Sequence, residues 1–124
     1  MALTADILRG YTDTILLACL SEGDSYGYRM IKQIAGRSRG ALALKEPTLY
    51  TAFKRLAQDG LIDSYWGDED NGARRKYYRL TVKGRVRLEE DQHAWRQTRE
   101  ILDLLLLPES HSHTVFEGGI HDAE

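Results

Sequence analysis

The segment spanning residues 47–81 constrains the fold of this chain more than any other feature. It begins with a proline, which suits the first position of a helix because its missing N–H would find no partner there. Apolar residues then recur at helical spacing before Gly60, namely Leu49, Ala52, Phe53 and Leu56. Two strand-like runs, residues 61–66 and 74–80, flank a segment with Asn71-Gly72, a strong turn signal. We therefore predict a helix from about residue 46, followed directly by a β-hairpin.

The side of this predicted helix that faces away from its apolar residues is polar and basic. At about 100° per residue it carries Thr48, Thr51, Lys54, Arg55 and Gln58. The second predicted strand opens with three cations, Arg74, Arg75 and Lys76. A helix that enters the major groove beside a hairpin that grips the backbone is a common way to read duplex DNA. Thr48 and Thr51 suit base edges or thymine methyl groups, whereas Lys54 and Arg55 suit phosphate or guanine. We expect Tyr50 to contact the DNA backbone with its ring partly packed.

Three further helices are predicted around this segment. The first spans about residues 5–20 with Thr4 as its N-cap, the second about residues 26–37 behind Ser25, and the third about residues 82–107 behind Thr81. The polar tail that follows is predicted to be disordered. The chain thus divides into a DNA-binding domain of residues 1–81, a helix of residues 82–107 and a tail of residues 108–124.

Charge is divided unevenly along the chain. Residues 1–88 hold 15 Lys and Arg against 10 Asp and Glu, a net charge of +5. Residues 89–124 hold 2 against 9, a net charge of −7. The basic charge is therefore confined to the part with the predicted helix and hairpin, which indicates a polyanionic partner.

Composition and motifs exclude several other classes of protein. The longest apolar run, residues 15–20, is far too short to cross a bilayer, and no signal peptide is evident. The single cysteine, Cys19, is expected to be a buried apolar group, with a redox role as a minor alternative, and it fits a reducing cytoplasm. No catalytic triad, phosphate-binding loop or paired carboxylates stand out, so we predict neither an enzyme nor a cofactor. His111, His113 and His121 lack neighbouring ligands at metal-binding spacing and are expected to be solvated.

In this order and spacing, a series of short motifs resembles the PadR family of bacterial transcriptional regulators. The motifs are Tyr26-Gly27-Tyr28, Pro47-Thr48-Leu49-Tyr50, Arg55-Leu56, Gly60-Leu61-Ile62, Trp66-Gly67 and the run from Gly72 to Thr81, with Gly84 following. The resemblance covers about residues 5–107. It implies a mainly α winged helix-turn-helix with a small β-hairpin, a homodimer, and repression of a neighbouring gene that a small molecule often relieves.

The chain is similar to the short branch of that family, which has a single C-terminal helix. In the predicted last helix Leu88, Trp95 and Leu102 occur at every seventh residue, as in a helix-pairing seam. We expect this helix to serve dimerisation, with a surface formed by Leu8, Ile15, Leu88, Trp95, Leu102 and Leu105.

Several residues have two interpretations. Trp95 is either an aromatic anchor of the dimer or, as in members of the short branch, part of a cavity between protomers that stacks on planar aromatic ligands. Tyr26 and Tyr28 are either core residues or phosphate contacts near a helix N-terminus. The cations at residues 74–76 either balance Asp68, Glu69 and Asp70 or grip phosphate, and the second suits a cluster better.

The function predicted from the sequence is a cytoplasmic, homodimeric repressor that binds a pseudo-palindromic operator. Its predicted DNA contacts are Tyr26, Tyr28, Thr48, Tyr50, Thr51, Lys54, Arg55, Arg74, Arg75 and Lys76. Two alternatives remain: a sensor whose main chemistry is aromatic ligand binding, and a winged-helix protein-interaction module that does not bind DNA.

Overall fold

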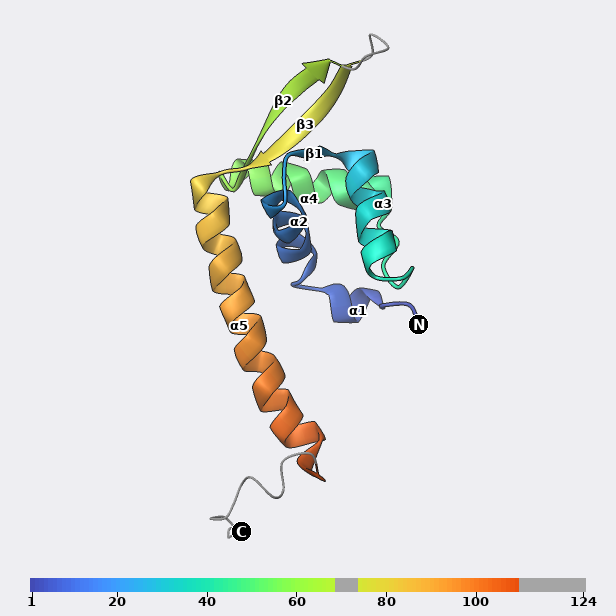
Figure 1. The fold of residues 1–124 in the computed structure, drawn as a ribbon, viewed down its shortest axis with the longest axis vertical. Helices are drawn as coiled ribbons and strands as arrows, with labels where there is room; N and C mark the ends of the chain where they lie inside the picture. Colours follow the sequence, from blue (N-terminus) through green and yellow to red (C-terminus); the bar gives the residue numbers. More distant parts are fainter. Residues whose placement is uncertain (69–73, 110–124) are drawn as a thin grey trace. The chain divides into compact units, whose positions relative to one another are not determined.

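A computed structural model describes residues 1–68 and 74–109 of the chain. Over these residues the fold is mainly helical with one small antiparallel sheet, as predicted (Figure 1). The elements in chain order are α1 (Ala5–Leu8), α2 (Thr12–Ser21), β1 (Ser25–Tyr26), α3 (Gly27–Arg37), α4 (Glu46–Gln58), β2 (Ile62–Asp68), β3 (Arg74–Leu80) and α5 (Val82–Leu106).

The first predicted helix is broken in two, which corrects the prediction of one helix over residues 5–20. Thr4 caps α1 as expected, with its hydroxyl accepting a hydrogen bond from the Ile7 amide at 3.3 Å. Gly10 then adopts a φ of 90°, a left-handed conformation that ends the helix. A new helix, α2, starts at Thr12.

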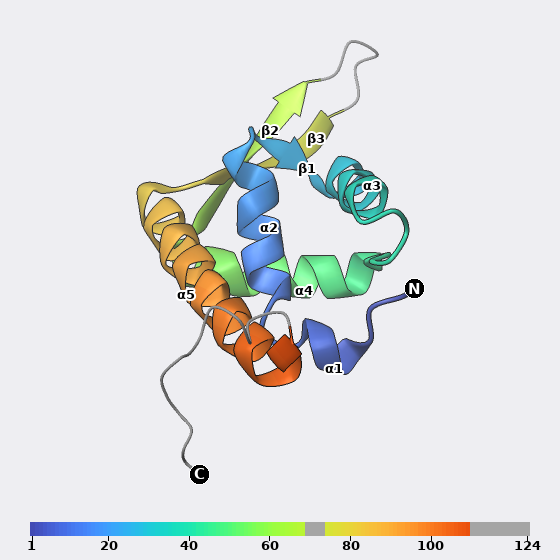
Figure 2. The ribbon, with the colours of Figure 1, turned by 60° about the horizontal axis from the view of Figure 1, so that its bottom comes forward.

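Helices α2, α3 and α4 pack together around one hydrophobic core, and α2 crosses α4 (Figure 2). Leu16 and Leu17 of α2, Met30 of α3 and Leu49 and Leu56 of α4 are completely buried. The predicted span of α4 is confirmed, with Pro47 in its first turn. Gly60 follows the C-terminal end of this helix with a φ of 76°, a left-handed conformation in which a residue with a Cβ would be strained.

The sheet has the strand order β1-β3-β2, and β3 is its central strand. Strands β2 and β3 form the predicted hairpin, with Ile62 opposite Leu80 and Trp66 opposite Lys76. The third strand was not predicted: Ser25 and Tyr26 pair with Tyr78 and Tyr77. Ser25 therefore does not cap α3, and its buried hydroxyl instead accepts a hydrogen bond from Arg29 Nε at 3.1 Å. The predicted Asn71-Gly72 turn lies outside the described residues.

Helix α5 begins as the sequence predicts. The Thr81 hydroxyl accepts a hydrogen bond from the Gly84 amide at 2.9 Å and donates one to the Gly60 carbonyl oxygen at 2.8 Å. The chain forms two compact units, Met1–Glu89 and Glu90–Glu124, and the division falls within α5. Leu88 belongs to the core of the first unit and is only 3% exposed. Leu88 is therefore not available to a surface between protomers, which corrects its predicted place in the helix-pairing seam.

Candidate nucleic-acid interface

The solvent-exposed side of α4 is the polar and basic side that the sequence predicts. Leu49, Ala52, Phe53 and Leu56 are buried, and the exposed residues include Thr48, Tyr50, Thr51, Lys54, Arg55 and Gln58. At about 100° per residue, Thr51, Lys54 and Gln58 lie opposite the buried side. Thr48 and Arg55 lie along one edge of the exposed side, and Tyr50 lies along the other. Gln58 therefore belongs with the candidate contact residues, although we did not predict it as one of them.

Arg55 is held within its own chain. Its Nε donates to Asp13 Oδ2 at 3.1 Å and its Nη2 donates to Asp13 Oδ1 at 2.5 Å, so that the pair joins α4 to α2. The hydrogen bond to Asp13 raises the pKa of the Arg55 guanidinium above its ordinary value. Beside this pair lies a surface hollow of about 350 Å³, lined by Thr12, Pro47, Thr48, Thr51, Ala52 and Arg55.

Tyr50 is partly a packing residue. Its ring meets Phe53 edge-on, with the ring centres 5.8 Å apart, and 46% of its surface is exposed. A Cβ at Gly27 would lie only 2.5 Å from the Tyr50 hydroxyl oxygen. The glycine of the Tyr26-Gly27-Tyr28 motif therefore makes room for Tyr50 where α3 meets α4.

The three cations at the start of β3 do not form one cluster, because successive side chains of a strand point to opposite faces. The Arg74 guanidinium lies over the Trp66 ring at 5.4 Å, and the Lys76 ammonium lies 5.9 Å from the centre of the Tyr78 ring. The Arg75 guanidinium instead lies 4.3 Å from the centre of the Tyr26 ring. The predicted single grip by all three residues is thus divided between the two faces of the hairpin.

On the face of the sheet that carries Arg75, aromatic and basic side chains pack together in one layer. Tyr26, Tyr77 and Tyr65 follow one another across the three strands, with ring centres 5.4 and 5.6 Å apart. The Arg29 guanidinium lies 4.9 Å from the centre of the Tyr26 ring, and that of Arg79 lies 5.0 Å from Tyr65. We did not predict Arg29 or Arg79 as contact residues. The signal for Arg79 was available, because it lies two residues after Tyr77 and therefore on the same face.

Tyr26 and Tyr28, which the sequence places either in the core or in contact with phosphate, have different surroundings in the structure. Tyr26 is half-buried within the layer, whereas Tyr28 is 58% exposed, with the Lys32 ammonium 5.3 Å from the centre of its ring.

Two other tyrosines of the sheet have raised pKa values. Tyr78, on the other face, is buried and stacks on Phe53 with the ring centres 3.9 Å apart, and burial raises the pKa of its phenol. The Tyr65 hydroxyl donates to Asp24 Oδ2 at 2.7 Å, which raises the pKa of Tyr65.

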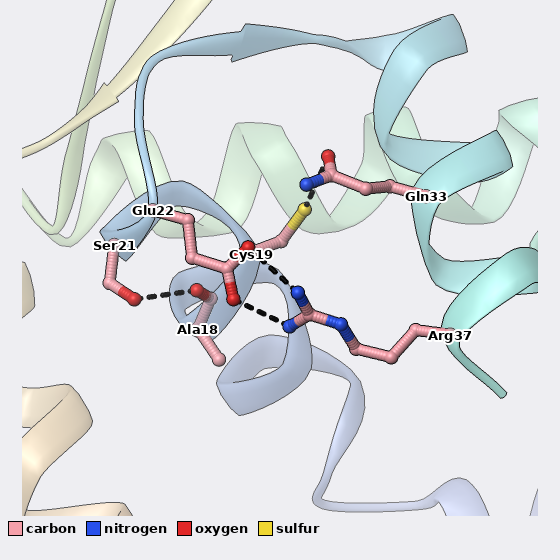
Figure 3. A network of polar contacts seen from close by, with 6 residues as sticks. All are labelled: Ala18, Cys19, Ser21, Glu22, Gln33 and Arg37. Carbon is pink, nitrogen blue, oxygen red and sulfur yellow. Dashed lines mark hydrogen bonds and ion pairs between the residues drawn. The ribbon is translucent and has the colours of Figure 1, made fainter.

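Cys19 lies in a small polar network between α2 and α3 (Figure 3). Its thiol donates to Gln33 Oε1 at 3.4 Å, and burial raises its pKa, which lowers the thiolate fraction. Nearby, Arg37 donates to both carboxylate oxygens of Glu22, at 2.5 and 2.9 Å. This contact lowers the pKa of Glu22 and raises that of Arg37. Cys19 is thus buried, as expected of an apolar group, although its thiol also makes a polar contact.

The second unit contributes exposed apolar residues from α5. Trp95 is 43% exposed, as is Leu102, and Leu105 is 71% exposed. Leu8 and Ile15, the other predicted dimer residues, lie in the first unit and are partly buried against its core. Within residues 1–68 and 74–109, no helix is long and apolar enough to span a membrane, and His, Cys, Asp and Glu form no group that could hold a metal. The histidines at 111, 113 and 121 lie outside these residues.

The arrangement of α3, α4 and the β2–β3 hairpin defines a winged helix-turn-helix. The sequence matches the transcriptional regulator PadR-like family over residues 16–90. A transcriptional regulator from Clostridium thermocellum is 42% identical, with a TM-score of 0.73 over 80% of this chain and 96% of that one. A PadR family transcription regulator from Clostridium difficile is 40% identical, with a TM-score of 0.70 over 78% of this chain and 99% of that one. An uncharacterised protein from Lysinibacillus sphaericus is 40% identical over 102 residues, 82% of this chain and 94% of its own length. The chain belongs to the PadR-like family of transcriptional regulators.

Proposed function

We propose that this protein is a homodimeric repressor that binds duplex DNA in the bacterial cytoplasm, with α4 in the major groove and the β2–β3 hairpin on the flanking backbone. The observation that carries the proposal is the exposed face of α4. Its hydroxyl, amide and ammonium groups can meet base edges. The basic hairpin beside it supplies cations for phosphate, and phosphate contacts position a protein on DNA while base contacts specify the sequence.

Charge and symmetry support the same proposal. The net charge of +5 lies in residues 1–88, which include every element that would approach DNA. A two-fold symmetric dimer presents two copies of α4, so the operator should be a pseudo-palindrome with half-sites about one helical turn apart. The exposed apolar residues of α5 supply a surface for such a dimer.

Relief of repression by a planar aromatic ligand at Trp95 stays a prediction. What supports it is an indole that is 43% exposed in the middle of α5, in a chain segment with several acidic neighbours. A stacked indole can bind a flat or cationic ligand through its ring face.

The first prediction is that duplex binding falls steeply as salt concentration rises, because each phosphate contact releases counterions. Changing Arg74 and Lys76 to Ala should lower the affinity for any duplex and reduce the slope of log affinity against log salt by about two. Fluorescence anisotropy of a labelled duplex measures both quantities.

The matched control is the double change of Arg9 and Arg37 to Ala, which removes the same charge from the residue that follows α1 and from the last residue of α3. Both of these arginines form ion pairs with acidic residues of their own chain. The control should leave the slope close to that of the wild type. If the two double variants lost the same slope, net charge rather than the hairpin would govern binding, and the proposed hairpin contact would be wrong.

A further inference from the structure

The ion pair between Arg55 and Asp13 leaves part of the guanidinium unused. An arginine carries N–H donors on all three of its nitrogens, arranged in a rigid plane. Asp13 engages only Nε and Nη2, each through a different carboxylate oxygen. A two-point contact of this kind fixes the plane as well as the position of the guanidinium. The donors on Nη1 and the second donor on Nη2 are therefore held at the edges that Asp13 does not occupy.

Arg55 lines the hollow of about 350 Å³ between the start of α2 and the exposed side of α4. The other polar side chains in its lining are those of Thr12, Thr48 and Thr51, and the lining contains no carboxylate. Hydroxyl groups and an arginine edge together form a donor set that suits an oxyanion. In the proposed complex, the oxyanion at the edge of a helix in the major groove is a backbone phosphate.

Asp13 lies in the first turn of α2, where a carboxylate favours the helix, but on a surface that binds DNA its charge is unfavourable. A carboxylate close to the DNA backbone repels phosphate, so electrostatics alone disfavours it there. Its side chain is 23% exposed while that of Arg55 is 49% exposed, so the arginine is the more accessible partner. A carboxylate that already holds the arginine in place raises the affinity for DNA overall. The arginine side chain then has little conformational freedom left to lose when it binds phosphate.

We propose that Asp13 is a positioning residue, which holds Arg55 so that its remaining donors bind one DNA backbone phosphate in the hollow formed with Thr12, Thr48 and Thr51. The inference rests on the proposed function and names a part of it. It assigns Arg55 to phosphate rather than to guanine, and it gives a role to an acidic residue on a surface that binds a polyanion.

The second prediction tests the sign of the effect of Asp13. Asp13→Ala removes a negative charge, so a purely electrostatic role predicts tighter binding of DNA. Positioning predicts the opposite: affinity should fall about fivefold to tenfold, equally for a random-sequence duplex and for a duplex selected by the wild-type protein, because phosphate contacts do not read sequence. Anisotropy titrations of the two duplexes measure the affinities and their ratio.

The arginine background isolates positioning from charge. Arg55→Ala should lower affinity about tenfold and reduce the salt slope by about one. With Arg55 already replaced, Asp13→Ala should no longer weaken binding and should strengthen it slightly, because only its repulsion remains. Arg55→Lys keeps the charge but not the planar fork, so it should restore little of the affinity.

Glu22→Ala is the matched control, because Glu22, directly after α2, also accepts a two-point contact from an arginine, Arg37 of α3. It should leave affinity unchanged or slightly higher. Thermal melting of each variant establishes that the fold is retained, and Asp13→Asn replaces Asp13→Ala if the alanine variant does not fold. Wild-type protein that binds no duplex would overturn the proposed function itself. If the wild-type protein binds DNA but the Asp13 variant binds it more tightly, this inference alone is overturned.

Discussion

At Gly84, a single hydrogen atom in place of a side chain lets α5 start against Leu61, the residue just before β2. A Cβ at this position would lie 2.0 Å from the Leu61 carbonyl oxygen and 2.8 Å from Leu80 Cδ1. The first of these atoms belongs to the backbone, which cannot move aside as a flexible side chain can. Gly84 is therefore required by close approach and not by its φ.

The third prediction compares two glycine-to-alanine changes in helices. Gly84→Ala should lower the free energy of unfolding by about 3 kcal/mol, because α5 must shift away from Leu61. Gly36→Ala should raise it by about 0.5 to 1 kcal/mol, since a Cβ there meets no atom within 4 Å and alanine favours a helix. Urea denaturation measures both. Equal effects would mean that the helix start has room that the structure lacks.

Individual side-chain partners were the part that the sequence could least predict. The polar side of α4 follows from helical spacing alone, and the structure confirms it. The partner of Arg55 does not follow, because Asp13 is 42 residues away along the chain and no local pattern joins them. The separation of Arg75 from Arg74 and Lys76 is different, since strand alternation contains that information and three consecutive cations suggested a cluster instead.

Among the helices and strands, those with strong boundary signals were predicted well. Pro47 and Gly60 mark α4, and Thr81 marks the start of α5, because each acts on the backbone within one turn. The break at Gly10 was missed, since a single glycine inside an apolar repeat does not by itself end a helix. Strand β1 was missed because it has two residues and exists only through its pairing with β3.

The fourth prediction concerns the middle of the exposed side of α4. Replacing Lys54 or Gln58 with Ala should reduce the preference for a selected duplex over a random one by about tenfold, because lost base contacts affect only the matching sequence. Lys76→Ala in the hairpin is the comparison, and it should weaken both duplexes while leaving their ratio unchanged. A constant ratio in the α4 variants would show that another element reads the bases.

At the scale of the whole chain, the two units differ in how completely they bury their apolar residues. The first unit has a closed core that includes Leu88. In the second, large apolar side chains near the end of α5 are exposed by 43% to 71%: Ile101, Leu102, Leu104, Leu105, Leu106 and Leu107. A surface of this kind is typical of an interface between chains.

The fifth prediction is that truncation after Asp91 gives a folded monomer. The cut leaves the core of the first unit intact and removes the exposed apolar residues of α5 from Trp95 onward. Light scattering should report a dimer for the full chain and a monomer for the truncated one, while circular dichroism should show a cooperative melt for both. A truncated protein that remained a dimer would exclude α5 as the main dimer element.

The short strand β1 has a mechanical consequence for the proposed complex. Because Ser25 and Tyr26 pair with β3 immediately before α3 begins, the hairpin is anchored to the helix-turn-helix as well as to the end of α4. The spacing between the hairpin and α4 is then a fixed length, and DNA has to conform to it. Because groove width and DNA bending depend on sequence, a fixed distance between the hairpin and α4 favours some sequences over others. This preference extends to base pairs that no side chain contacts.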